Sequence, residues 1–134
     1  TFFDRLRPEA PVWRANRTLT DDPSLRLTPQ RRHHPMRDDI TINNVADRVW
    51  LRVEYQTLRR LPQSDVIIFT IRILRQKIAS VADHPETLTQ LVSSLAKMPS
   101  DVRGYKDSTW RHAQVIREWA LSTGQVTKEK LTEN

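Results

Sequence analysis

Two stretches of the sequence decide the fold: residues 50–58 read WLRVEYQTL, and residues 66–74 read VIIFTIRIL. The first stretch alternates in polarity, which is the period of a half-buried strand. The second is rich in β-branched residues and almost continuously apolar, which predicts a buried strand. Between them, residues 61–65 (LPQSD) have turn chemistry and are too few for anything but an antiparallel hairpin.

The apolar pattern also predicts which residues of the hairpin face each other. If Arg60 faces Val66, one face becomes mostly apolar through three pairs: Val53 with Ile73, Tyr55 with Ile71, and Thr57 with Phe69. The same register places Glu54 opposite Arg72 and Gln56 opposite Thr70 on the other face. Opposite charges across a strand pair stabilise it by about 0.2–1 kcal/mol.

Helical signals follow the hairpin. A first helix is predicted from a cap at Asp83 or His84 to Pro99, with its apolar positions at Leu88, Leu91, Val92, Leu95 and Met98. A second helix is predicted from Asp107 or Ser108 to Gly124, with a stripe made of Trp110, Ala113, Ile116, Trp119 and Ala120. The last ten residues are polar, and we expect them to fray.

The segment before the hairpin is predicted to be irregular. Prolines at positions 8, 11, 23, 29 and 35 recur too often for a long helix or a central strand, although residues 11–16 (PVWRAN) fit a short edge strand. The sequence thus predicts an α+β fold in three segments: the proline-rich residues 1–49, the hairpin core 50–80, and a two-helix segment 81–134.

The composition excludes several classes of protein. The absence of cysteine excludes disulfides, thiolate metal sites and cysteine nucleophiles. No apolar run approaches the roughly 18 residues of a membrane span, and no signal peptide opens the chain, so we expect a soluble cytoplasmic protein. The chain starts with Thr1-Phe2-Phe3 rather than Met, which we interpret as a cut from a longer chain or as processing.

The positive charge is spread along the chain. The net charge is +6 and the pI is about 10.3, and 17 of the 22 basic residues are arginine. The excess of positive charge does not gather in one tail. Only the pI therefore supports the hypothesis of a basic nucleic-acid-binding domain, and we disfavour it. Arg31, Arg32 and Arg37 are offset by Asp38-Asp39 and are interpreted as an exposed loop.

The polar face of the hairpin is the best candidate for chemistry. Arg52, Glu54, Gln56 and Arg72 are predicted to project together from rigid strands, where they could anchor an anion, orient a ligand or exchange protons with it. A solvated sheet face or a structural ion pair gives the same pattern, so these alternatives stay open.

Other motifs are weak or missing. His33-His34, His84 and His112 lack the spacing of metal ligands, and Trp110 and Trp119 fit packing better than base stacking. The chain contains no P-loop, GxGxxG or GxSxG motif, which disfavours nucleotide-binding enzymes and hydrolases of those types.

Four segments taken together resemble a known family. They are residues 2–8 (FFDRLRP), 12–16 (VWRAN), 51–62 (LRVEYQTLRRLP) and 68–72 (IFTIR). In this order and spacing they are similar to the haem-dependent oxidative N-demethylases, which include the α subunits of dimethylamine-type monooxygenases. The third segment is the specific one, and the resemblance covers about residues 2–105, roughly the C-terminal half of a family chain.

The resemblance implies a PAS-like domain whose antiparallel sheet forms a wall of a haem b pocket. It implies removal of a methyl group from a small secondary amine with dioxygen, electrons from a flavin and iron–sulfur reductase partner, and release of formaldehyde, with tetrahydrofolate as an acceptor. Arg52 and Glu54 would be catalytic, and Gln56, Arg72 and Tyr55 would contact the cofactor. The iron-ligating histidine is expected outside this chain.

Two departures from the family pattern leave a second hypothesis open. Tyr55 stands where the family usually has Arg after the Glu, and Arg17 stands where it usually has an aromatic residue. If the missing Arg is the donor to oxygen, the chain would be a PAS-like sensor or small-molecule binding module without catalysis.

Overall fold

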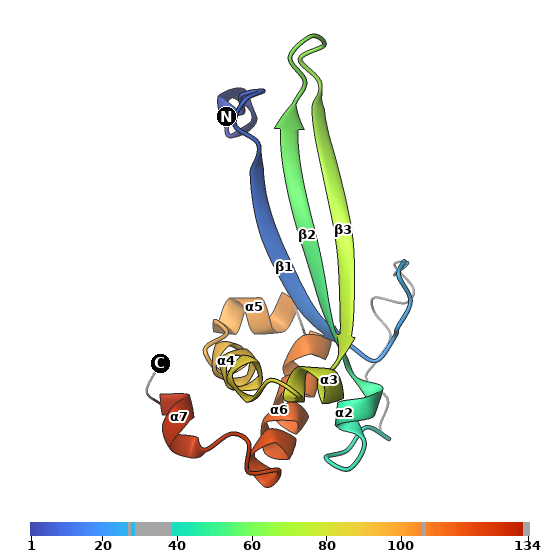
Figure 1. The fold of residues 1–134 in the computed structure, drawn as a ribbon, viewed down its shortest axis with the longest axis vertical. Coiled ribbons are helices and arrows are strands. Elements are labelled where there is room, and N and C mark those ends of the chain that lie inside the picture. Colours follow the sequence, from blue (N-terminus) through green and yellow to red (C-terminus); the bar gives the residue numbers. More distant parts are fainter. Residues whose placement is uncertain (27, 29–38, 106, 133–134) are drawn as a thin grey trace. The chain divides into compact units, whose positions relative to one another are not determined.

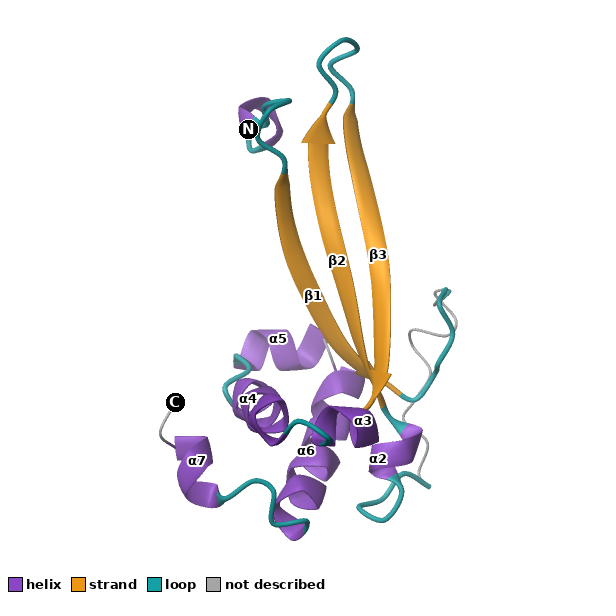
Figure 2. Ribbon diagram, viewed as in Figure 1, coloured by secondary structure: helices purple, strands orange, loops and turns teal. Residues whose placement is uncertain are grey.

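The predicted hairpin is present in the computed structural model. It consists of β2 (Trp50–Arg60) and β3 (Ile67–Lys77), each 11 residues long (Figure 2). At the turn, the Leu61 N–H donates to the Val66 carbonyl at 2.8 Å and the Asp65 N–H donates to the Leu61 carbonyl at 3.1 Å. Asp65 has a φ of 59°, the left-handed conformation that Asp and Asn tolerate best after glycine.

A third strand completes the sheet. β1 (Val12–Thr20) pairs with β2, so the order is β1-β2-β3, with β2 in the centre and neighbouring strands antiparallel (Figure 1). β1 is an edge strand, as predicted for residues 11–16, but it extends to Thr20 and is nine residues long. A short 3₁₀ helix, η1 (Phe3–Arg5), precedes it. The chain therefore has the α+β class that its pattern predicts.

The structure describes residues 1–26, 28, 39–105 and 107–132. These residues form two compact units. Unit 1 consists of Thr1–Arg17 and Arg52–Leu74, and unit 2 of Thr18–Leu51 and Arg75–Asn134. The interpretation of residues 31–38 as an exposed loop, and the placement of His33 and His34, lie outside the described residues.

Unit 2 contains the helices that follow and precede the hairpin. They are α2 (Val45–Arg48), α3 (Ile78–Ala82), α4 (Pro85–Ala96), α5 (Ser100–Tyr105), α6 (Asp107–Ser122) and α7 (Lys128–Thr132). α4 and α6 correspond to the two predicted helices, although α4 ends at Ala96, before the predicted position Met98, and α3, α5 and α7 were not predicted. Pro85 occupies the first turn of α4 with His84 at the N-cap, and Gly124 follows α6 with a φ of 72°.

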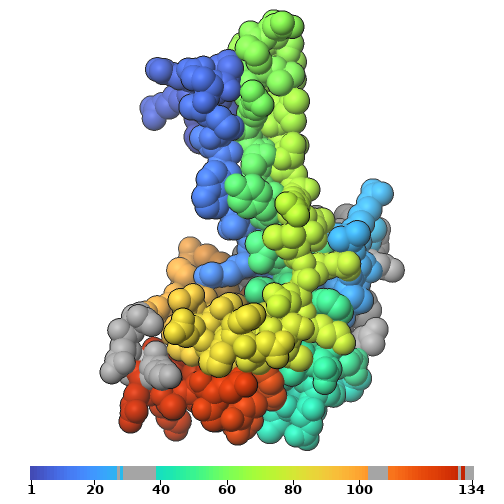
Figure 3. Space-filling model, in the orientation of Figure 1, coloured from blue at the N-terminus to red at the C-terminus, as the bar shows by residue number. Residues whose placement is uncertain are grey.

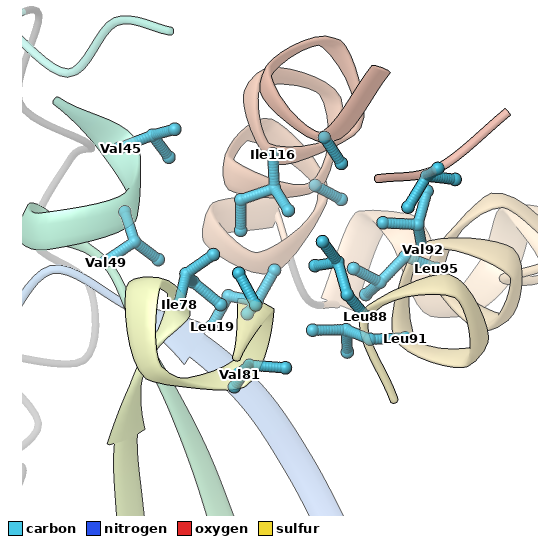
Figure 4. Packing of buried hydrophobic residues seen from close by; sticks show 14 of the residues in the cluster. Leu19, Val45, Val49, Ile78, Val81, Leu88, Leu91, Val92, Leu95 and Ile116 are labelled. Carbon is cyan, nitrogen blue, oxygen red and sulfur yellow. The ribbon is translucent and has the colours of Figure 1, made fainter. Parts of the chain in front are cut away.

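The helices of unit 2 enclose an apolar core. Leu88 from α4 and Ile116 from α6 are fully buried, as are Val45 and Val49 near α2 and Ile78 from α3 (Figure 4). The Ile78 N–H also donates to the Val49 carbonyl at 3.1 Å, which joins the segments on either side of the hairpin within this core. The predicted apolar stripes of α4 and α6 are therefore core positions, since Leu91, Val92, Leu95, Ala113 and Ala120 are buried too.

The C-terminal segment differs from the prediction that it frays. Val126 is 1% exposed, and α7 brings Leu131 against the same core. Two apolar residues in ten are too few for a periodicity signal, but they are enough to anchor one helical turn. No helix among the described residues has the length and apolar character needed to cross a membrane.

The prediction that β3 is a buried strand is wrong. Phe69, Ile71 and Leu74 are 53%, 48% and 47% exposed, and the atoms of β3 (yellow-green) lie at the surface in Figure 3. β3 is an edge strand with a single neighbour, and unit 1, all of whose residues the structure describes, contains no α-helix to cover the sheet. An apolar run predicts a strand but does not show what covers it.

Candidate functional site

Three polar side chains form a row on one face of β2. Arg52, Glu54 and Gln56 alternate along the strand, so their side chains project from the same face. Arg52 is 3% exposed and Gln56 is 7% exposed, while the Glu54 side chain keeps 21% of its surface accessible. Buried polar groups on a rigid strand are expected to be hydrogen-bonded, and these are.

Glu54 lies at the centre of the row and accepts from both neighbours. Arg52 Nη2 lies 3.5 Å from Glu54 Oε1, and Gln56 Nε2 donates to Glu54 Oε2 at 3.0 Å. Each carboxylate oxygen therefore has one protein donor. A carboxylate has about four lone-pair sites, so the exposed part of Glu54 retains acceptor capacity for a ligand.

Arg14 on the neighbouring strand β1 extends the row. Its Nε donates to Gln56 Oε1 at 2.7 Å. Because an arginine nitrogen can only donate, this bond fixes the orientation of the Gln56 amide and turns its NH₂ group toward Glu54. We call Arg14, Arg52, Glu54 and Gln56 the carboxylate cluster. Arg14 was not predicted, because only the pairing of β1 with β2 reveals it.

The predicted register of the hairpin is wrong by one residue. The hydroxyls of Thr57 and Thr70 are hydrogen-bonded to each other, and the Leu61 N–H donates to the Val66 carbonyl. The prediction paired Thr57 with Phe69 instead. A slip of one residue moves every side chain of one strand to the other face relative to its partner. Since β3 is apolar on both faces, its pattern could not distinguish the two registers.

The corrected register separates the five predicted site residues. Arg52, Glu54 and Gln56 come together as predicted, but Arg72 lies on the opposite face, across from Tyr55, and is exposed. Tyr55 stacks on Trp13, with ring centroids 5.3 Å apart and an interplanar angle of 24°. The predicted cross-strand pair of Glu54 with Arg72 is therefore absent, and Glu54 is paired along its own strand with Arg52.

A second arginine of β2 ties the N-terminal segment to the sheet. Arg60 Nε donates to the Leu6 carbonyl at 2.8 Å, and its Nη2 donates to the Phe3 carbonyl at 2.7 Å. Arg60 Nη1 also pairs with Asp65 Oδ1 at 2.8 Å across the turn. These contacts make Arg60 a structural residue that holds the backbone of Phe3 and Leu6 against the sheet.

The carboxylate cluster does not have the set of side chains that a metal centre needs. It contains no histidine, and no group of three His, Asp or Glu that could hold a metal ion occurs among the described residues. His84 and His112 both belong to unit 2.

Fold and site together define an α+β protein whose sheet presents a held carboxylate on one face. A family model described as haem-dependent oxidative N-demethylase, alpha subunit-like, matches residues 1–116. The chain belongs to this family. The match includes the whole sheet and the carboxylate cluster, and it extends into α6.

Proposed function

We propose that this chain supplies the sheet wall of a haem pocket in an enzyme that oxidatively demethylates a small secondary amine. The observation that supports this most directly is Glu54, a partly exposed carboxylate that Arg52 and Gln56 hold in place. Such an amine is protonated at neutral pH, and a fixed carboxylate with spare acceptor capacity is a suitable partner for it.

The surroundings of Glu54 suit the alkyl groups of an amine. In the register set by Thr57 and Thr70, Ile73 of β3 lies opposite Glu54, and Ile71 lies opposite Gln56. Ile71 is 48% exposed, so apolar surface is accessible next to the carboxylate. A charged acceptor beside apolar surface selects a cation that carries small apolar groups.

The proposed reaction converts a secondary methylamine, dioxygen, two electrons and two protons into a primary amine, formaldehyde and water. Haem b, bound with an iron ligand from outside this chain, would supply the oxygen chemistry. Glu54 would bind the ammonium group, and Arg52 is our candidate donor toward the oxygen side. Electrons would come from a flavin and iron–sulfur reductase, and tetrahydrofolate would accept the formaldehyde.

Formaldehyde release by the haem-loaded full-length gene product, with dimethylamine as the probe, tests this function. Glu54→Gln should lower kcat/KM by at least about 100-fold, because it removes the charge that anchors the amine. Glu9→Gln is the matched control, since Glu9 is an exposed residue of unit 1 outside the cluster. Equal turnover by wild type and Glu54→Gln would contradict the role of Glu54.

A second candidate function rests on Tyr55. The family pattern usually has Arg at this position, and Tyr55 here stacks on Trp13 instead of offering a charged donor. The alternative is a PAS-like module that binds haem or another small molecule without catalysis. A stoichiometric Soret band without formaldehyde release from any methylamine would favour this alternative, and rapid turnover would exclude it.

A further inference from the structure

The sheet of unit 1 has a second polar and aromatic surface, opposite the carboxylate cluster. Alternation along β2 places Tyr55, Thr57 and Arg59 on this face. The bond between Thr57 and Thr70 places Arg72 of β3 on it too, across from Tyr55, and the stack on Tyr55 adds Trp13 of β1. We call the surface formed by Trp13, Tyr55, Arg59 and Arg72 the aromatic face.

The aromatic pair on this face is open to solvent. Trp13 is 65% exposed and Tyr55 is 37% exposed, although their rings stack at 5.3 Å. Burial of an aromatic ring is strongly favourable, so a stacked pair that remains this exposed offers flat surface to a further ring. Aromatic rings gain about 0.5–1.5 kcal/mol from such stacking beyond the area that they bury.

The charge on the aromatic face has one sign. Arg59 and Arg72 are exposed. None of the strand positions of unit 1 on this face carries an acidic side chain. These positions are Trp13, Ala15, Arg17, Val53, Tyr55, Thr57, Arg59, Ile68, Thr70, Arg72 and Leu74. Directly opposite residues of neighbouring strands have Cβ atoms about 4.5–5.5 Å apart, so Arg72 lies within reach of a group bound at Tyr55. Arginine matches phosphate and carboxylate in geometry as well as in charge.

We propose that the aromatic face binds a small planar aromatic ligand that carries phosphate or carboxylate groups. The ring would stack on the Trp13–Tyr55 pair, and Arg72 and Arg59 would bind the anionic groups. A nucleic-acid strand would need several stacking positions along its path, whereas this face has a single pair, which favours a single ring system. This site is separate from Glu54 and does not depend on the proposed demethylation.

Two probes represent the sources of this chemistry: ATP carries phosphates, and folic acid carries carboxylates. Each is titrated into the full chain, with binding followed by quenching of tryptophan fluorescence and by calorimetry. At least one probe should bind saturably. Trp13→Leu should remove the part of the quenching that comes from Trp13, which distinguishes binding at this site from binding near the other three tryptophans.

Two pairs of variants test the residues. Arg72→Gln should weaken binding by about tenfold or more, because a charge-assisted pair is lost, whereas Arg5→Gln removes the same charge from an exposed position outside the face. Tyr55→Leu should weaken binding by about five- to tenfold, and Tyr55→Phe, which keeps the ring, by less than about twofold. Circular dichroism checks that each variant folds.

Several outcomes would overturn the proposal. They are the absence of binding by both probes, an equal loss from Arg5→Gln and Arg72→Gln, and equal affinity of Tyr55→Leu and wild type. If a twelve-nucleotide oligo-dT binds far more tightly than ATP and with a steep dependence on salt, the ligand of this face is a single nucleic-acid strand and not a small molecule. None of these readouts uses amine turnover, so they can fail independently of the function proposed for Glu54.

Discussion

The two units of this chain hold their structure in different ways. Unit 2 packs apolar side chains from five helices (α2, α3, α4, α6 and α7) into one core, in which Leu88 and Ile116 are fully buried. Unit 1, whose residues the structure describes without a gap, buries one apolar side chain, Leu6. Its other large apolar side chains are mostly exposed, namely Phe2, Phe3, Trp13, Tyr55, Val66, Ile68, Phe69, Ile71 and Leu74.

Burial of apolar side chains stabilises unit 2, whereas unit 1 keeps most of its large apolar side chains at the surface. Unit 2 follows the usual rule that apolar burial dominates folding. Unit 1 relies on its strand ladder and on polar contacts, such as Arg14 with Gln56 and Arg60 with two backbone carbonyls. A surface this apolar exceeds what a solvated sheet face needs, and it is typical of a region that binds something. Both proposals above place a ligand there.

The largest expected effect tests this difference directly. Ile116→Ala in α6 should lower the free energy of unfolding by about 2–5 kcal/mol, because it opens a cavity at a fully buried position. Ile71→Ala removes the same atoms from a side chain that is 48% exposed, and it should lower the free energy by less than about 1 kcal/mol. Urea denaturation followed by circular dichroism measures both. Equal losses would mean that Ile71 is covered in solution.

The sequence predicts unit 2 better than unit 1 for a physical reason. Helical periodicity is a local property, and the spacing of Leu88 and Ile116 with their neighbours was enough to place α4 and α6. The tail is the exception, because Val126 and Leu131 give no periodic signal. The short turn between the strands was enough to predict the hairpin. Its register was predicted wrongly, because strand pairing is not a local property of the sequence.

The same reasoning applies to the candidate site. The alternation of Arg52, Glu54 and Gln56 within one strand correctly predicted that they share a face. Arg72 and Arg14 depend on how other strands align with β2. The first was placed on the wrong face and the second was missed. The contact of Tyr55 with Trp13 also depends on strand pairing, so no pattern within one strand could reveal the aromatic face.

The second largest effect concerns the carboxylate cluster. Glu54→Ala should lower the free energy of unfolding by about 2 kcal/mol, because the buried Arg52 loses its carboxylate partner. Arg52→Met combined with Glu54→Leu should recover part of that loss, since no charge is then left buried. A double-mutant cycle of Arg52→Met and Glu54→Leu, each alone and both together, measures the coupling by urea denaturation. A coupling of zero would show that the pair contributes nothing to the sheet.

A smaller effect is expected at Arg14. Arg14→Leu should lower the free energy of unfolding by about 1 kcal/mol, because it removes the bond that orients the Gln56 amide. Loss of this bond should also be visible by NMR, because the Gln56 side-chain NH₂ signals should shift and their protons should exchange faster with water. Arg7→Leu is the matched control, as Arg7 is exposed. Unchanged Gln56 signals in Arg14→Leu would contradict the role of Arg14 in orienting the amide.

The smallest effect is expected from Asp65→Asn at the hairpin turn, where charge and backbone conformation can be separated. Asp65→Asn removes the ion pair with Arg60 but keeps a side chain that tolerates a φ of 59°, so the loss should be within about 0.5 kcal/mol and vanish in high salt. Asp65→Val keeps neither property, and its β-branched side chain should add about 1–2 kcal/mol of strain at this φ. Hydrogen exchange of the Leu61 amide, which donates to Val66 across the turn, measures both variants locally. Faster exchange in Asp65→Asn than in Asp65→Val would mean that the charge, and not the left-handed conformation, makes Asp the better residue here.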